Sequence, residues 1–371
     1  MVETGRMLER PVHGGLNLAE LRRLGLDPRA VLDFSSSINP LGAPPGILDT
    51  IAGVNLAAYP DSDCLELREA LGVRLNLEPE RILAGNGSTE LIHLLATAYL
   101  SEGGSALILG PTFGEYRTAC MAQGVEPTEI VAREADDFRW DVAEVYHAIR
   151  EAEPRLVFLC NPNNPTGLYL GEDEVRKIAE ALCAGSSDGV LVLDEAYVSF
   201  VDDAWDALTL LDIPNVVLLR SMTKDYALTG LRLGYMVSSP EVVSRVKARQ
   251  YSWSVNAAAQ AAGVMCLGLR RHLDDGREAV RTGKAYLDNA LASMGLNCRA
   301  GAANFLLVSV GPMRLAASVR LRLLKEHGIC VRDCTSFGLP NHIRIGVRKM
   351  DDCRRLVAAL EEIQAEAPAD G

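Results

Sequence analysis

The chain has 371 residues, of which 48% are hydrophobic and 23% charged, and its net charge is −12 at pH 7. These proportions are those of a folded globular protein, and they exclude disordered, collagen-like and coiled-coil classes. Because an acidic surface repels phosphate backbones, we expect no nucleic-acid partner, although a few local arginines can still bind a small anion.

Cysteine usage and the N-terminal segment bear on the compartment. The nine cysteines are scattered, and neither they nor the six histidines show the spacing of a metal site, so we expect reduced thiols and no metal. The first residues include acidic side chains and lack the apolar segment of a signal peptide. The apolar runs are far shorter than a membrane span requires. These features predict a cytoplasmic protein without a membrane partner.

Short apolar runs alternate with helical patterns from about residue 81 onward. The runs are continuous, as expected for strands buried on both faces, and the helical patterns between them include Ser88–Leu100 and Glu172–Cys183. This order predicts an α/β fold with a mainly parallel central sheet. The runs lie at Arg81–Ala84, Ala106–Leu109, Leu156–Cys160, Val190–Leu193, Val216–Leu219 and Leu233–Val237.

The pattern changes after about residue 260. A long helical stretch around Ala262–Met294 precedes a β run at Asn304–Val310, and shorter runs follow at Ile329–Arg332 and Ile343–Val347. We interpret this part as a smaller α+β domain. The expected division is an N-terminal arm over residues 1–46 that packs with the small domain, a large domain over 47–265 and the small domain over 266–371. The first twelve and last six residues are expected to be frayed.

Polar motifs follow four of the predicted strands. Ligands in open α/β sheets bind beyond the carboxyl ends of the strands, so these positions are candidates for a site. The motifs are Gly85-Asn86-Gly87-Ser88-Thr89, Asn161-Pro162-Asn163-Asn164-Pro165-Thr166-Gly167, Asp194-Glu195-Ala196-Tyr197 and Ser221-Met222-Thr223-Lys224, the last followed by Arg232.

Each motif has a chemical and a purely structural interpretation. The glycine motif begins a helix whose free N–H groups suit a phosphate, and it also fits an ordinary turn with Ser88 as N-cap. The rigid asparagine loop can aim Asn164 at a ligand, or it is only a turn. A buried Asp194 needs a positive partner such as a pyridinium nitrogen, unless it only caps a helix. Lys224 suits a nucleophilic amine, unless it is an exposed loop lysine.

Taken together, the four motifs favour one cofactor. Asn164, Asp194 and Lys224 are each 30 residues apart, which is about one βα unit per step. The set supplies a phosphate cradle, a carboxylate, a phenol, an amine and a second cation. These are the groups that pyridoxal 5′-phosphate (PLP) requires.

With these motifs the sequence resembles the class I/II, fold type I superfamily of PLP-dependent aminotransferases, from His13 to about Leu360. The resemblance implies a large domain with a mainly parallel seven-stranded sheet, a smaller α+β domain, and PLP as the cofactor. It implies a homodimer with shared active sites. It implies that Lys224 links covalently to PLP and that Asp194 pairs with the pyridine nitrogen.

The remaining cofactor contacts also come from the resemblance. Tyr197 and Asn164 would bind the ring O3′, and Tyr116 would stack on the face of the ring. The cofactor phosphate would be held by Gly87, Ser88, Thr89, Ser221 and Arg232, and by Tyr59 of the neighbouring subunit.

Two subfamilies are similar to the chain. The strings His13-Gly14-Gly15 and Asp33–Gly42 resemble L-threonine O-phosphate decarboxylase, as do Arg220–Ala227 and Arg249–Asn256. The departures are Ser36-Ser37, where the decarboxylase arm usually reads Ala-Asn, and Tyr197, which is typical of the aminotransferases. Both subfamilies use phosphorylated substrates, and the resemblance implies a substrate site at His13, Asn39, Arg332 and Arg344.

The first functional prediction is therefore decarboxylation of L-threonine O-phosphate to (R)-1-amino-2-propanol O-phosphate in cobalamin biosynthesis. The second is transamination of histidinol phosphate in histidine biosynthesis. A non-catalytic, regulatory PLP-binding protein is the alternative from another class. The complete set of Lys224, Asp194 and Asn164 argues against that alternative.

Overall fold

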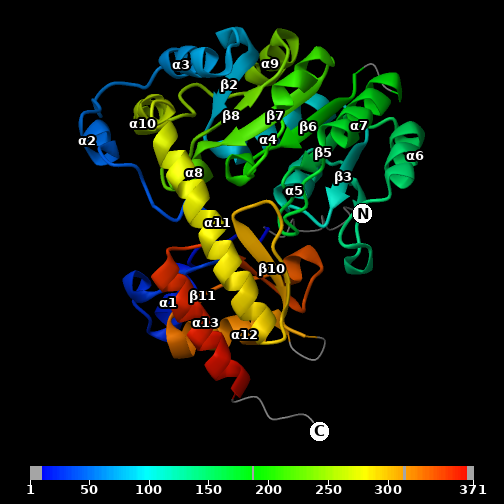
Figure 1. The fold of residues 1–371 in the computed structure, drawn as a ribbon. Helices are drawn as coiled ribbons and strands as arrows, with labels where there is room; N and C mark the ends of the chain where they lie inside the picture. Colours follow the sequence, from blue (N-terminus) through cyan, green and yellow to red (C-terminus); the bar gives the residue numbers. More distant parts are fainter. Residues whose placement is uncertain (1–10, 186–187, 312–314, 366–371) are drawn as a thin grey trace, which may run out of the picture.

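The computed structural model describes residues 11–185, 188–311 and 315–365, and its centre is a seven-stranded sheet (Figure 1). The strand order is β2-β8-β7-β6-β5-β3-β4, and only β8 runs antiparallel to its neighbours. The mainly parallel seven-stranded sheet is therefore confirmed. Its strands are β2 Ile82–Gly85, β3 Ala106–Gly110, β4 Thr128–Val131, β5 Leu156–Cys160, β6 Val190–Asp194, β7 Val216–Ser221 and β8 Gly234–Val237.

Helices cover both faces of this sheet. In β5, Leu156 and Phe158 pack into one apolar cluster, whereas Val157 and Leu159 pack into the other. Alternation of side chains along a strand thus buries both faces, which explains the continuous apolar runs. One face packs against α4 Gly87–Leu100, α5 Glu115–Ala122 and α9 Pro240–Lys247, and the other against α3 Leu65–Leu75, α6 Val142–Ala152, α7 Glu172–Gly185 and α10 Ala257–Leu267.

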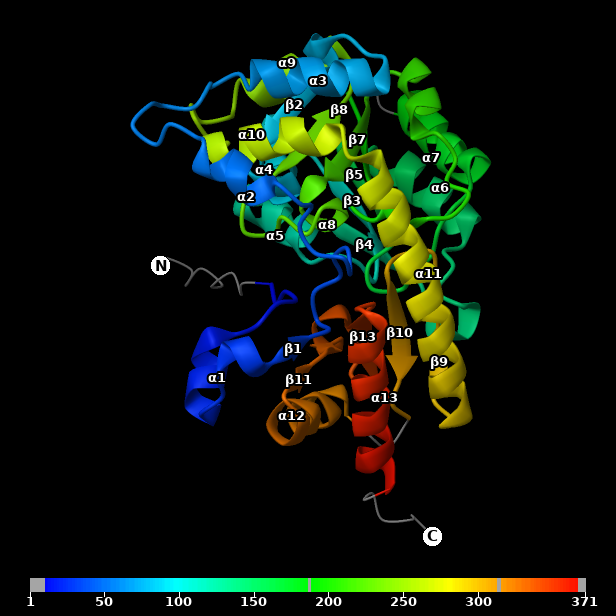
Figure 2. The ribbon, with the colours of Figure 1, turned by 60° about the vertical axis from the view of Figure 1, so that its left-hand side comes forward.

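A second, smaller layer lies beside the large sheet (Figure 2). It is a four-stranded antiparallel sheet in the order β12-β13-β10-β9, and the N-terminal β1 pairs with β11 in parallel. The long helix α11, Arg270–Ser293, extends from the large sheet to the small one (Figures 1 and 2). The other elements here are β1 Leu32–Asp33, β9 Asn297–Arg299, β10 Phe305–Ser309, β11 Ile329–Cys330, β12 Arg332–Asp333, β13 His342–Gly346, α1 Leu18–Leu24, α12 Ala316–His327 and α13 Met350–Ala365.

The predicted elements differ from the observed ones in three places. The stretch 262–294 is two helices, α10 and α11, with Gly268 between them. The run 329–332 is two short strands that pair with different partners. Strand β4 has no continuous apolar run to predict it, because Thr128 and Glu129 are exposed at the edge of the sheet. The division of the chain at residues 46 and 265 stays a prediction.

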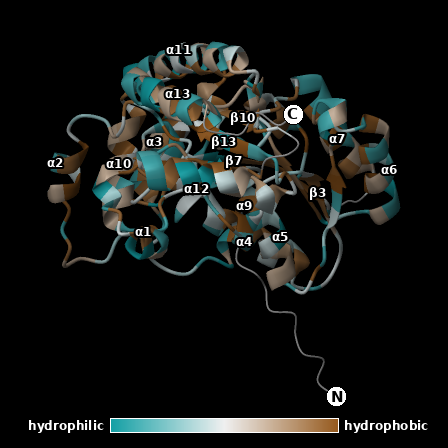
Figure 3. Ribbon diagram, turned by 90° about the horizontal axis from the view of Figure 1, so that it is seen from below, coloured by the Kyte–Doolittle hydropathy of each residue, from teal (hydrophilic) through white to brown (hydrophobic). Residues whose placement is uncertain are grey.

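Hydrophobic residues are concentrated in the strands of the sheet, and hydrophilic residues in the outer helices. In Figure 3 the strands β3 and β7 are mainly hydrophobic, whereas α11 carries hydrophilic stretches along its length. Within the described ranges, no helix has the combined length and apolar character that crossing a membrane requires. The predicted frayed termini fall largely outside the described residues, so only residues 11 and 12 of them have a described structure.

Candidate active site

Two adjoining cavities open at the carboxyl ends of the parallel strands, facing the small sheet. The outer cavity has a volume of about 540 Å³, and a narrow inner pocket adjoins it. Both are lined by Thr89, Asn164, Tyr197 and Lys224, one from each of the four strand-end motifs. The fold therefore brings together residues that lie up to 135 positions apart in the chain (89 to 224).

Asp194 forms the floor of the inner pocket at the end of β6. Its side chain accepts hydrogen bonds from the Tyr116 hydroxyl (2.8 Å) and from the backbone N–H of Ala196 (3.0 Å). Burial raises the pKa of Asp194, and these two donors oppose that rise. An ionised carboxylate at this depth is stabilised by a positive partner, which a protonated pyridine nitrogen supplies.

Tyr116, which is predicted to stack on the cofactor ring, lines the inner pocket. The side chain is fully buried, stacks on Phe158 with ring centroids 4.7 Å apart, and donates its hydroxyl to Asp194. Phe113, three residues earlier, lines both cavities, as Tyr197 does. Phe113 stands in the same motif as Tyr116, but the sequence does not tell which of these two rings also reaches the outer cavity.

Lys224 lies in the short helix α8, Met222–Asp225, and its side chain lines both cavities. Burial lowers the pKa of its amine, and the positive charges of Arg232 and Arg344 act in the same direction. A lysine of this kind is a nucleophile at a pH where an exposed lysine is protonated.

The start of α4 and Arg232 form a compact anion cradle. Gly87 has a φ of +77°, and a Cβ there would lie 2.6 Å from the Arg232 guanidinium, so only glycine fits. Gly234 is equally constrained, because its Cβ would lie 2.5 Å from the backbone nitrogen of Ser88. Free N–H groups at a helix start beside a guanidinium suit a phosphate. Ser221 is buried against Thr223, with their hydroxyl oxygens 2.7 Å apart, and lines neither cavity.

The asparagine loop is held rigid by its own side chains. Asn161 bonds the backbone of Leu170 with both ends of its amide (2.7 and 3.1 Å), and Asn163 donates to the Pro111 carbonyl (2.9 Å). These bonds leave Asn164 to face the cavities, where its Oδ1 accepts from Arg344. Tyr197 packs edge-on against Phe305, and burial raises its pKa to about 12, so its hydroxyl keeps its proton.

Two arginines from the small sheet line the outer cavity. Arg332 and Arg344 are direct partners across β12 and β13, and they are only 5% and 4% exposed. Arg332 donates to the Val12 carbonyl (2.7 Å) and Ser336 Oγ (2.6 Å), and Arg344 donates to the Ser35 carbonyl (2.8 Å). Neither is within ion-pair distance of a carboxylate in the part of the chain that the structure describes. Two adjacent buried guanidinium groups without a counterion are a strong anion site.

Two other predicted residues lie outside the cavities. Asn39 is buried, donates to the Asp225 carbonyl (2.9 Å) and accepts from the Leu41 N–H (3.0 Å), so it supports the chain next to Lys224 and does not face substrate. Tyr59 is 79% exposed and stacks on Trp253 at 4.5 Å, away from the cavities of its own chain. His13 lines the outer cavity as expected, and its partner Glu115 was not predicted.

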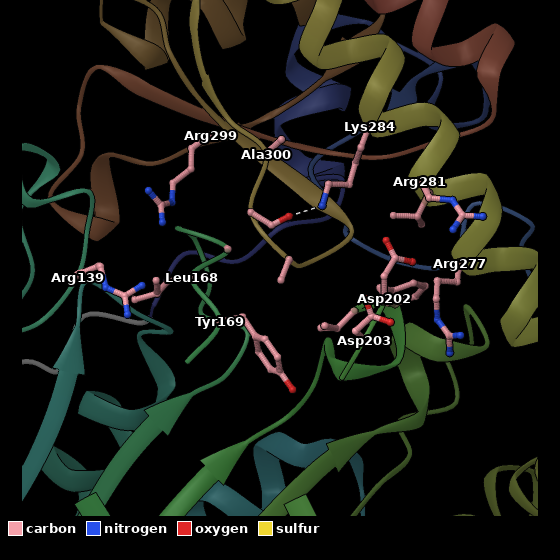
Figure 4. A pocket seen from close by; sticks show the side chains of 16 residues that line it. Arg139, Leu168, Tyr169, Asp202, Asp203, Arg277, Arg281, Lys284, Arg299 and Ala300 are labelled. Carbon is pink, nitrogen blue, oxygen red and sulfur yellow. Dashed lines mark hydrogen bonds between the residues drawn. The ribbon is translucent and has the colours of Figure 1, made fainter. Parts of the chain in front are cut away.

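A further cavity of about 600 Å³ lies between the large sheet and α11, apart from this site (Figure 4). Lys284 reaches across it to the Gly301 and Ala303 carbonyls, and Arg299 donates to the Thr166 carbonyl (3.0 Å). None of the predicted site residues lines this cavity. The contact between Arg299 and Thr166 at this cavity joins the end of β9 to the end of the asparagine loop.

The chain is similar to known proteins in both sequence and fold. Residues 29–360 match the family model for aminotransferase class I and II. The chain belongs to this family. Histidinol-phosphate aminotransferase from Symbiobacterium thermophilum is 36% identical to it over 348 residues, which cover 93% of each chain.

Two solved structures of this aminotransferase family are similar over most of the chain. Histidinol-phosphate aminotransferase from Sinorhizobium meliloti, in complex with PLP, has a TM-score of 0.84 at 25% identity and covers 94% of this chain and 95% of its own. L-threonine-O-3-phosphate decarboxylase from Porphyromonas gingivalis has a TM-score of 0.78 at 26% identity, and the match covers 91% of this chain and 100% of that one. The fold is thus fold type I, and PLP is the cofactor.

The pocket residues fit PLP. The buried Asp194 lacks a cationic partner within ion-pair distance among the described residues, the cradle at Gly87 excludes any side chain, and Lys224 stands between them. The similar proteins include both a histidinol-phosphate aminotransferase and an L-threonine-O-3-phosphate decarboxylase.

Proposed function

We propose that the protein decarboxylates L-threonine O-phosphate to (R)-1-amino-2-propanol O-phosphate and CO2, a step of cobalamin biosynthesis. The observation that carries the proposal is the pair Arg332 and Arg344, two buried guanidinium groups that face the outer cavity without a carboxylate partner among the described residues. Such a pair binds a phosphate with charge-assisted, bidentate hydrogen bonds. His13 adds a third polar group, so the cavity suits a compact substrate with two anionic groups.

The cofactor contacts follow the geometry of the inner pocket. Lys224 would bind PLP covalently, Asp194 would hold the pyridine nitrogen protonated, and Asn164 and Tyr197 would bind the ring O3′. The ring would lie against Phe113. The cofactor phosphate would be held at the cradle by Gly87, Ser88, Thr89 and Arg232, with Ser221 behind it and Tyr59 from the second subunit.

The site residues decide which bond to the substrate Cα breaks. When bound, PLP would supply an electron sink for the electron pair of a bond to the substrate Cα. If Arg332 and Arg344 hold the substrate phosphate, neither guanidinium is free to bind the substrate carboxylate as well. The carboxylate would then be the group that leaves Cα, as CO2. The Lys224 side chain in its protonated form would donate the proton that replaces the lost group at Cα.

A homodimer is part of the proposal. Tyr59 and Trp253 form an exposed aromatic pair, and Leu56 (90% exposed) and Tyr251 (85% exposed) are further large apolar side chains on neighbouring segments. Exposed apolar groups of this size favour burial against another protein surface. A second copy of the chain would cover them and would bring Tyr59 to the cofactor phosphate of its partner.

Histidinol-phosphate transamination is the second candidate. It is supported by the name of the Symbiobacterium relative, which is 36% identical. The same two arginines would hold the phosphate of histidinol phosphate. That substrate has no carboxylate, so only the Cα–H bond could break, and a keto acid would be needed to accept the amino group.

The deciding experiment is CO2 release by the PLP-loaded protein from L-threonine O-phosphate without any keto acid. Many turnovers per active site, lost in Lys224→Ala, would support the decarboxylase. If CO2 is absent while L-histidinol phosphate and 2-oxoglutarate give glutamate, the decarboxylase proposal is wrong and the aminotransferase takes its place.

A further inference from the structure

Glu115 connects two histidines at the mouth of the active site. Its Oε1 lies 2.7 Å from His13 Nε2 and its Oε2 lies 3.0 Å from His93 Nε2. Glu115 is the first residue of α5 and is 8% exposed, whereas the two histidine side chains are about 40% exposed (43% and 38%). The carboxylate is thus fixed from both sides, and one of its partners lines the outer cavity.

The segment that carries His13 is held over the cavity by several further contacts. The Val12 carbonyl accepts from Arg332 (2.7 Å), and the Gly15 N–H donates to Ser35 Oγ (2.8 Å). Gly14 packs so closely on the Ser35 carbonyl that a side chain there is excluded. This explains the glycine directly after the histidine, and it fixes the backbone that carries the imidazole beside the pocket.

The segment of His13 contacts both the arginine pair and the wall of the inner pocket. Val12 accepts a hydrogen bond from Arg332, and the His13 ring lies 5.5 Å from the ring of Phe113, which lines the inner pocket as well as the outer one. The two arginines enter from the small sheet, on β12 and β13. A substrate whose phosphate lies on the arginines and whose Cα lies at the inner pocket would extend past the His13 ring.

The hydrogen bond to Glu115 determines which ring nitrogen of His13 carries a proton. The two histidine partners lower the pKa of Glu115 to about 2, so the group is a carboxylate and only accepts. His13 Nε2 must then carry a proton, and Nδ1 has no hydrogen-bond partner in the described ranges and is available to a ligand. In the doubly protonated imidazole, Nδ1–H donates to an anion while Glu115 compensates the charge.

We propose that Glu115 is a positioning residue that holds the His13 imidazole against the α-carboxylate of the substrate. His93 orients the carboxylate of Glu115 from the opposite side. This inference rests on the proposed phosphorylated amino-acid substrate and deepens it, because it assigns the phosphate to Arg332 and Arg344 and the carboxylate to His13. It makes Glu115 a determinant of specificity for substrates that carry both groups.

The experiment compares two ligands on the PLP-loaded enzyme and its Glu115→Ala variant. L-threonine O-phosphate carries a carboxylate, and 1-amino-2-propanol O-phosphate does not. Binding of each is titrated through the change in cofactor absorbance. Because a hydrogen bond to a charged group is lost, we expect the first ligand to bind about tenfold or more weakly, and the second to change less than about twofold.

Three further variants separate positioning from a general structural effect. Glu115→Gln keeps an acceptor for Nε2 without the charge, so its affinity is expected between those of the wild type and Glu115→Ala. The double variant His13→Ala/Glu115→Ala is expected to bind no more weakly than His13→Ala, because Glu115 acts through His13. Glu174→Ala, which removes a carboxylate paired with Arg139 outside both cavities, is the matched control and should bind as the wild type does.

The outcomes are distinguishable from a failure of the proposed reaction. Equal weakening of both ligands by Glu115→Ala would overturn the assignment, since His13 would then serve the phosphate. Unchanged binding of L-threonine O-phosphate in both Glu115 variants would overturn it as well. A wild type that binds L-threonine O-phosphate but releases no CO2 would contradict the reaction alone, because binding is read from the absorbance change immediately after rapid mixing, before any turnover.

Discussion

The Tyr116 hydroxyl donates to Asp194 Oδ2 at 2.8 Å, inside a fully buried contact at the end of the central strand β6. A donor to the ionised form of a carboxylate lowers its pKa, and at Asp194 this bond opposes the rise that burial causes. The tyrosine therefore tunes the group that is proposed to face the cofactor nitrogen.

Replacement of Tyr116 by Phe should weaken PLP binding. Loss of the donor raises the pKa of Asp194 further, so the carboxylate is less available to a pyridinium. A lost hydrogen bond to a charged group costs about 1.5–3 kcal/mol, so we expect the PLP dissociation constant to rise about tenfold or more, measured by equilibrium dialysis. The control is Tyr146→Phe, because the Tyr146 hydroxyl is buried without a hydrogen-bond partner among the described residues. Unchanged affinity in Tyr116→Phe would contradict the tuning role.

The cofactor-free protein should become more stable when Lys224 is replaced by Met. Burial lowers the pKa of this amine, so at neutral pH the unfolded chain binds a proton that the folded chain holds less firmly. Stability of the wild type therefore falls as pH falls below the ordinary lysine pKa of about 10.4. Urea unfolding at several pH values should give the variant a higher free energy of unfolding than the wild type at pH 7. This difference should disappear above about pH 10. A difference in the free energy of unfolding that does not change with pH would show that packing, and not charge, causes the stabilisation.

Replacement of Arg332 by Gln should impair substrate binding and spare the cofactor. The guanidinium lines the outer cavity but not the inner pocket, so cofactor absorbance is expected to stay unchanged. Loss of charged hydrogen bonds to a phosphate should raise KM about tenfold to a hundredfold. Arg348→Gln, at the end of the same small sheet and outside the cavity, serves as control. Equal effects of the two substitutions on KM would refute a specific role for Arg332.

The buried ion pair behind the pocket should matter for folding. Arg220 Nε lies 2.9 Å from Glu195 Oε2, and the glutamate side chain is 2% exposed. Glu195→Ala leaves Arg220, whose side chain is 18% exposed, without its carboxylate partner, so we expect a loss of about 3 kcal/mol in the free energy of unfolding, at the lower end of the range for buried pairs. Asp351→Ala breaks the exposed pair with Arg354 and should cost about 0.5 kcal/mol or less. Denaturant titration measures both, and similar losses would be inconsistent with this reasoning.

The exposed aromatic pair Tyr59 and Trp253 should lie in a dimer interface. A charge at Leu56, which is 90% exposed beside this pair in the chain, would be tolerated in a monomer but not inside an apolar interface. Leu56→Asp is therefore expected to shift the protein from dimer to monomer in sedimentation experiments and to weaken PLP binding. Glu326→Lys, on the exposed face of α12, is the control. A wild type that is monomeric at micromolar concentration would rule out the interface.

Local pattern determined much of the fold and the inner pocket. Continuous apolar runs predicted six strands of the large sheet, because strands buried on both faces need apolar residues at every position. The residues that follow such strands converge on one edge of a parallel sheet whatever the details of packing. For that reason the spacing of Asn164, Asp194 and Lys224 is enough to predict that they lie together, and all three line the inner pocket.

Tertiary packing decided the rest. Phe113 and Tyr116 stand three residues apart and both line the inner pocket, but of the two only Phe113 also lines the outer cavity, whereas Tyr116 is stacked on Phe158. Asn39 lies in a motif shared with substrate-binding arms, yet it bonds to a backbone carbonyl 186 residues away. His13 and Glu115 meet across 102 residues. Such contacts depend on how distant elements rotate and pack against one another, and a local pattern carries no information about that rotation.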